Sequence, residues 1–63
     1  MASERRFAEV RKMLEAAGYT FTRSKGSHHS FTKPNHPVIV VPVHRGKVKP
    51  VYVRQIEKLS EGE

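Results

Sequence analysis

Residues 19–33 read YTFTRSKGSHHSFTK, in which two segments of strand-forming residues flank a Gly-Ser pair. From residue 19 to 24 the side chains alternate with the period of a β-strand. Lys25-Gly26-Ser27 has the composition of a tight turn, and residues 28–33 resume the strand pattern. The stretch predicts a β-hairpin. One face of its first strand is expected to hold Tyr19, Phe21 and Arg23.

The segment before the hairpin predicts an amphipathic helix from Glu4 to Ala17. Ser3 can cap its first turn, and Gly18 suits the left-handed residue that follows a helix. Between these ends, apolar residues recur every three or four positions and so share one face: Phe7, Val10, Leu14 and Ala17.

The segment after the hairpin predicts a third strand and a second helix. Residues 34–37 form a turn, and Val38–Val41 is a β-branched run that we expect to be the best-buried strand, weakened at its end by Pro42. Residues 44–49 are expected to form a polar basic loop. Pro50 can begin a short helix, whose apolar side holds Tyr52, Val53, Ile56 and Leu59.

The predicted element order is therefore α-β-β-β-α within one domain, residues 1–63. The economical arrangement is an α+β fold: a three-stranded antiparallel sheet with both helices on one face. Double-stranded-RNA-binding domains have the same element order, which suggests RNA by analogy of fold alone.

The formal net charge is +6, and the charges are unevenly distributed. Residues 16–56 contain no acidic residue but hold seven Lys and Arg residues and all four histidines. Such a segment attracts polyanions, of which phosphate backbones are the commonest in cells. The alternative is that the charge serves solubility. An acidic lipid surface is a weaker candidate, because no basic amphipathic helix carries the charge.

Composition also limits the classes of protein to which the chain can belong. There is no cysteine, so the chain has no disulfide and no thiolate zinc site, which fits a reducing cytoplasm. The first ten residues contain no apolar run typical of a signal, and the longest apolar stretch, Val38–Val43, is too short to cross a bilayer. We expect a soluble cytoplasmic protein with no membrane partner.

The residue types in segment 16–56 fit metal-independent RNA cleavage. Nucleases that use magnesium need clustered carboxylates, which this segment lacks, so we expect no metal and no other cofactor. The alternative chemistry uses the ribose 2′-hydroxyl as nucleophile, with histidine as acid or base and Lys or Arg beside the phosphate. Zinc held jointly by His28 and His29 is disfavoured, since consecutive strand residues point to opposite faces.

The densest candidate site is Lys25-Gly26-Ser27-His28-His29, although two ordinary strand histidines would give the same sequence. Phe31 should face the core and place His29 on the same side, which leaves His28 open to solvent and RNA. His28 is therefore the predicted catalytic residue, with possible help from Ser27, His29 and Lys25. His36 fits an exposed turn residue. The predicted RNA-binding residues are Arg23, Lys25, Gly26, Lys33, His44, Arg45, Lys47, Lys49 and Arg54.

From Phe7 to Leu59 the sequence resembles the HicA family of bacterial and archaeal toxins, also described as YcfA-like proteins. The resemblance rests on Gly18-Tyr19, Arg-x-x-Gly-Ser-His-His at residues 23–29, Phe31, Pro34, Pro-x-His at residues 42–44, a basic Lys/Pro loop, and Val53 with Ile56. It implies a double-stranded-RNA-binding-like fold, metal-free mRNA cleavage that arrests translation, catalysis next to the Gly-Ser turn, and neutralisation by a HicB-type antitoxin. A non-catalytic RNA-binding module and a protein-interaction adaptor are the competing hypotheses.

Overall fold

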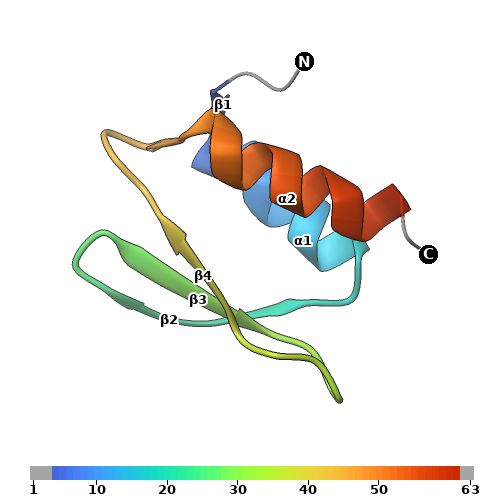
Figure 1. Ribbon diagram of the computed structural model, residues 1–63. Coiled ribbons are helices and arrows are strands. Elements are labelled where there is room, and N and C mark those ends of the chain that lie inside the picture. Colours follow the sequence, from blue (N-terminus) through green and yellow to red (C-terminus); the bar gives the residue numbers. More distant parts are fainter. Residues whose placement is uncertain (1–3, 62–63) are drawn as a thin grey trace.

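Three strands form an antiparallel sheet in the computed structural model, which describes residues 4–61. The strands are β2 (Thr20–Lys25), β3 (His28–Thr32) and β4 (Ile39–Pro42), in the spatial order β2-β3-β4. The helices α1 (Phe7–Ala16) and α2 (Pro50–Glu61) lie side by side on one face of this sheet (Figure 1). The predicted α+β fold and its element order are confirmed. We call the sheet face opposite the helices the outer face.

Among the described residues, eight buried side chains between the sheet and the helices form the core. Phe31 of β3 is completely buried, and its ring lies 5.4 Å from the ring of Phe21 and 6.2 Å from that of Phe7, centroid to centroid. Both helices, β3, β4, the short strand β5 (Lys47–Val48) and the connection between α1 and β2 contribute to this core. It consists of Val10, Leu14, Tyr19, Phe31, Val41, Val48, Val53 and Ile56.

The first helix begins later than its sequence predicts. Arg5–Arg6 is extended and forms a short strand, β1, which pairs with β5 (Lys47–Val48) in a second antiparallel sheet. The Phe7 N–H then donates to the Gly46 carbonyl oxygen at 2.8 Å. Pairing with residues 41 and 43 positions further along the chain overrides the local preference for a helix from Glu4. The expected cap, Ser3, lies outside the described residues.

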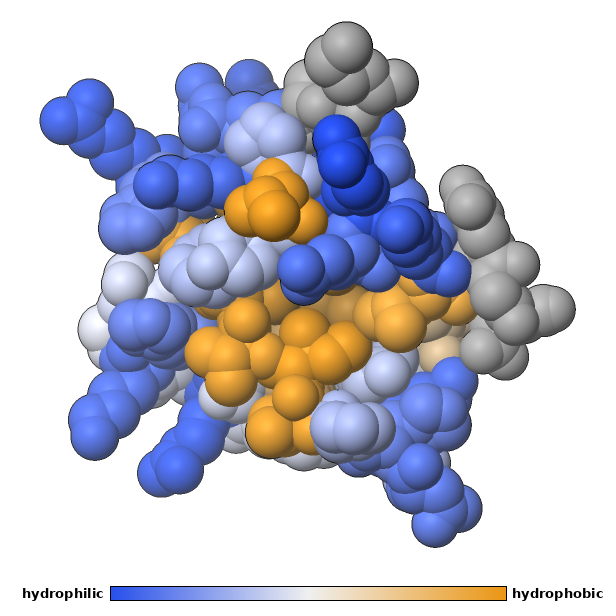
Figure 2. All heavy atoms as spheres, in the orientation of Figure 1, coloured by the Kyte–Doolittle hydropathy of each residue, from blue (hydrophilic) through white to orange (hydrophobic). Residues whose placement is uncertain are grey.

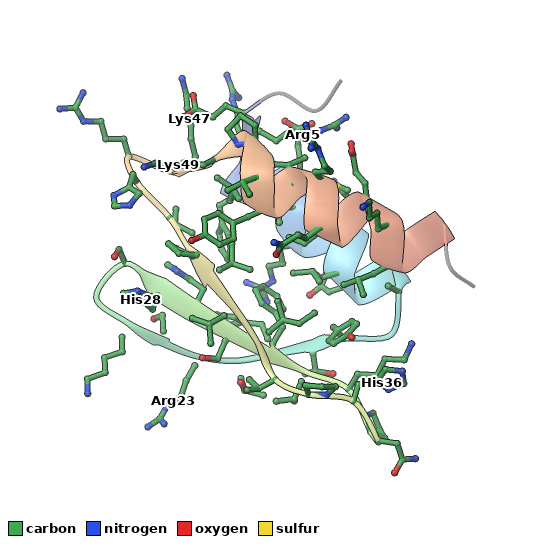
Figure 3. The ribbon with its side chains drawn as sticks, in the orientation of Figure 1. Arg5, Arg23, His28, His36, Lys47 and Lys49 are labelled. Carbon is green, nitrogen blue, oxygen red and sulfur yellow. The ribbon has the colours of Figure 1, made fainter. Side chains whose placement is uncertain are left out.

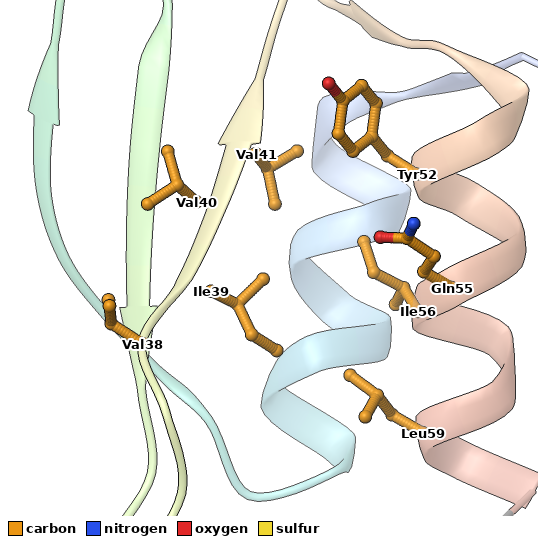
Figure 4. A pocket seen from close by; sticks show the side chains of 8 residues that line it. All are labelled: Val38, Ile39, Val40, Val41, Tyr52, Gln55, Ile56 and Leu59. Carbon is orange, nitrogen blue, oxygen red and sulfur yellow. The ribbon is translucent and has the colours of Figure 1, made fainter.

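The run Val38–Val41, expected to be the best-buried strand, is buried on one side only. Val41 is 1% exposed, but Val40 is 44% exposed and Val38 is 56% exposed. β4 is an outermost strand of a sheet with helices on one face only, so alternate side chains of the run point away from the core. Figure 4 shows Val41 and Ile39 on the side of α2 and Val40 on the opposite side.

The basic segment at residues 44–49 is more ordered than the predicted loop. Arg45 and Gly46 have φ values of 53° and 76°, and His44 and Lys47 exchange backbone hydrogen bonds of 2.9 Å across them. Two successive residues with positive φ make the type I′ turn that suits a tight hairpin. Val48 is then fully buried, so this segment supplies a core residue that its composition did not indicate.

The second helix agrees with its prediction. It begins at Pro50, which has no N–H to leave unpaired in the first turn, and it buries Val53 and Ile56 completely or nearly so. Neither helix within the described residues is long and apolar enough to cross a membrane.

The two central positions of β4 give a direct test of this packing. Val41→Ala removes two methyl groups from a filled core and should cost about 2 kcal/mol of unfolding free energy, or roughly 10 °C in Tm. Val40→Ala, the adjacent residue on the outer face, should cost less than about 1 kcal/mol. Thermal unfolding followed by circular dichroism measures both, and equal losses would contradict the described orientation of β4.

Candidate active site and nucleic-acid interface

The β2–β3 hairpin turns through Gly26 and Ser27, next to the paired residues Lys25 and His28. Gly26 has φ 60°, whereas φ of Ser27 is not positive. A two-residue turn with positive φ only at its first position is of type II′, which favours glycine there. A Cβ at Gly26 would meet nothing within 4 Å, so this backbone is open to solvent and to a ligand.

An irregularity in β2 changes the direction of its two cations. Phe21 pairs with Phe31, but the next pair is Arg23 with Ser30, so Thr22 is an extra residue. The Thr22 hydroxyl donates to the Ser30 carbonyl oxygen at 3.0 Å. The predicted placement of Arg23 on the same face as Phe21 is therefore wrong, because this β-bulge moves Arg23 to the outer face.

The bulge and the turn together build a hollow on the outer face. Its lining residues are Arg23, Lys25, Gly26, His28 and Ser30. The first four were predicted site residues, whereas Ser30 was missed, although strand alternation already placed it on the face of His28. Figure 3 shows His28 near the hairpin turn and Arg23 further along β2. The hollow offers an exposed imidazole, two cationic side chains and a hydroxyl.

His29 points to the other side of β3, as strand alternation predicts. Its half-buried ring packs 4.5 Å from the ring of Phe7 and 5.9 Å from that of Phe21. Its Nδ1–H donates to the Ser27 carbonyl oxygen at 3.2 Å, and the same carbonyl accepts the Val43 N–H at 2.7 Å. His29 and the Ser27 backbone therefore hold the turn, while the His28 side chain remains exposed.

Lys33 and His36 lie away from this hollow. The Lys33 Nζ donates to the Ala17 carbonyl oxygen at 2.8 Å, where a cation offsets the partial negative charge at the end of α1, and lies 5.5 Å from the Tyr19 ring centroid. Lys33 is five residues from His28, or roughly 16 Å along an extended strand. His36 is exposed, as predicted, and Figure 3 shows it at the opposite end of the sheet from His28.

The basic segment 44–49 follows directly beyond the turn end of the hairpin. The Val43 N–H donates to the Ser27 carbonyl oxygen, so Val43 lies against the Gly-Ser turn. His44 is the next residue along the chain. His44, Arg45, Lys47 and Lys49 are all exposed, and Figure 3 shows Lys47 and Lys49 toward the start of α2. Arg54 is also exposed, but it belongs to α2, which covers the face of the sheet opposite the hollow.

Ion pairs in the described residues are concentrated at the helices and the N-terminal strand. They join Arg5 to Glu9 and Glu57, Arg11 to Glu15, and Lys47 to Glu4. Within residues 4–61, no ion pair involves Arg23 or Lys25. Both cations are therefore available to an anionic ligand. No group of three histidine or acidic residues suited to a metal ion is found in this part of the chain.

A second hollow, of about 330 Å³, lies between β4 and α2. Figure 2 shows the apolar surface around it, bordered by hydrophilic side chains, and Figure 4 shows the residues that line it. They are Val38, Ile39, Val40, Val41, Tyr52, Gln55, Ile56 and Leu59. This groove is lined by no histidine and no charged side chain.

The chain was compared with known protein families, curated proteins and solved structures. The model of the family described as HicA toxin of bacterial toxin-antitoxin matches residues 7–61, which include both helices, the three-stranded sheet and the Gly-Ser-His turn. No curated protein and no solved structure matches the chain.

The different surroundings of the paired histidines predict different effects on stability. His29→Ala removes the ring contacts with Phe7 and Phe21 and the bond to Ser27, and should cost about 1–2 kcal/mol, or roughly 5–15 °C in Tm. His28→Ala should change the unfolding free energy by less than about 0.5 kcal/mol, because an exposed ring contributes little packing. Melting curves of the two variants measure this difference, and a larger loss for His28→Ala would contradict the described geometry.

Proposed function

Because the chain belongs to the HicA toxin family of bacterial toxin-antitoxin systems, we propose that it is a metal-independent endoribonuclease that cleaves mRNA in the hollow around His28. One observation carries this proposal: the exposed His28 imidazole shares a hollow with the cations Arg23 and Lys25 and with no acidic residue. General acid-base catalysis needs an accessible group that exchanges a proton near neutral pH, and transfer at phosphorus needs cations beside the phosphoryl oxygens.

The proposed reaction uses the ribose 2′-hydroxyl as the nucleophile. His28 accepts the 2′-hydroxyl proton while the 2′-oxygen forms a bond to phosphorus. The bond from phosphorus to the 5′-oxygen breaks, which leaves a 2′,3′-cyclic phosphate on one fragment. The departing 5′-oxygen takes a proton from water, which reaches the open hollow. Lys25 and Arg23 stabilise the charge that develops on the non-bridging oxygens.

We also propose how the toxin is controlled. Its antitoxin is of the HicB type and covers the basic outer face with acidic or carbonyl groups near His28, because complementary charge accelerates capture. The activity takes place in the cytoplasm, where mRNA is translated. Occupation of the hollow by the antitoxin would exclude RNA without altering the toxin's fold.

Cleavage of single-stranded RNA in the presence of EDTA tests the catalytic proposal. The wild-type protein should produce fragments, and His28→Ala should slow cleavage by about 10²-fold or more while still binding RNA. His36→Ala, which removes an exposed histidine at the other end of the sheet, should cleave normally. RNA bound but never cut by the wild-type protein would instead identify a non-catalytic RNA-binding module.

The basic segment 44–49 should contribute electrostatically to RNA binding. Neutralising Lys47 and Lys49 together with glutamine should reduce the slope of log affinity against log salt by about 1.4, since each phosphate contact on single-stranded RNA contributes about 0.7. The control is Lys12→Gln with Lys58→Gln, which removes the same charge from the exposed sides of the helices. Identical slopes for the two double variants would exclude segment 44–49 from the RNA interface.

A further inference from the structure

On the outer face of the sheet, each strand presents a different kind of side chain. The register aligns Lys25, His28 and Pro42 in one row, and Arg23, Ser30 and Val40 in the next. Residues directly opposite one another point to the same side of a sheet. β2 therefore presents cations, β3 presents an imidazole and a hydroxyl, and β4 presents apolar side chains.

The apolar part of this face is exposed. Val40 is 44% exposed, and Val38, immediately before β4, is 56% exposed. Both valines also border the groove between β4 and α2, so the apolar surface continues from the outer face around the β4 edge. Of the three large hydrophobic residues that are exposed in the described chain, only Val51 lies outside this segment. Exposed valines at the open edge of a small sheet favour aggregation unless a ligand covers them.

Charge identifies the class of ligand. The same face carries Arg23 and Lys25, and the chain has no acidic residue between positions 16 and 56. A second copy of this chain would bring a like-charged surface, which opposes association. The complementary ligand has a negative charge along one side and apolar surface along the other, and a single polynucleotide strand has this form.

We propose that the outer face binds single-stranded RNA along the strands, with phosphates on the Arg23 and Lys25 side and bases on Val40 and Val38. This deepens the proposed function and rests on it in taking RNA as the ligand. His28 and Ser30 lie between the two sides, where the ribose of a bound nucleotide would lie. The 2′-hydroxyl is then presented to the imidazole by the same contacts that hold the strand.

The arrangement also defines the form of RNA that it accepts. Every base has an apolar face, so contact with valine side chains depends little on base identity. In a duplex those faces are stacked between neighbouring pairs, and the A-form helix presents mainly phosphates and 2′-hydroxyls to a protein. The valines therefore select unpaired RNA, and the cations provide affinity regardless of sequence.

Binding of uncleavable oligonucleotides tests the proposal separately from catalysis. One probe is a short 2′-O-methyl oligouridylate, which lacks the free 2′-hydroxyl needed for cleavage, and the other is an abasic oligophosphate of equal length. Val38→Thr with Val40→Thr should weaken binding of the oligouridylate about three- to tenfold and leave the abasic probe unchanged. Arg23→Gln with Lys25→Gln should weaken binding of both probes and reduce their salt slopes by about 1.4.

The matched control is Val51→Thr, which alters an exposed valine of α2 and should change neither affinity. Circular dichroism at the binding temperature establishes that each variant is folded. The proposal would be overturned if the valine variant weakened binding of both probes equally. It would also be overturned if neither double variant affected the binding of any probe, and that result would assign the face to a protein partner. Because the probes cannot be cleaved, either result is independent of whether natural RNA is cut in EDTA.

Discussion

Burial of Phe31 fixes the direction of the other side chains on β3, and the site depends on that direction. Its ring fills the centre of the core against the rings of Phe7 and Phe21. Because side chains alternate along a strand, a slip of one residue would bring Phe31 to the surface and His28 into the core. The free energy gained by burying one aromatic ring thus keeps the imidazole of His28 exposed.

The two histidines next to the turn have different surroundings for the same reason. His29 faces the aromatic cluster and bonds to the Ser27 carbonyl, so it supports the turn from the helix side. His28 faces outward in a hollow with two cations, where a ligand can reach it. In so small a domain the core is thin, and packing His29 against it both stabilises the hairpin and leaves His28 exposed beside the turn.

The charges follow the same division between the two faces. The ion pairs of the described residues involve the helices and the short β1-β5 sheet, where the acidic residues are located. The outer face has cations without acidic neighbours. Their electrostatic field is therefore not offset within the protein and can attract an anionic ligand. This separation gives a toxin of the HicA family a stable helical side and a sheet surface suited to a polyanion.

The sequence by itself determined the element order, the Gly-Ser turn, the segregation of charge and the opposite orientations of His28 and His29, because these follow from local periodicity and from one large apolar residue. Only the tertiary structure decided the remaining features. The pairing of Arg5–Arg6 with Lys47–Val48 shortened the first helix, and the position of β4 at the sheet edge exposed Val40. The bulge at Thr22 moved Arg23 to the sheet face that carries His28. Each depends on contacts between segments distant in the sequence, which propensity and periodicity within one segment do not encode.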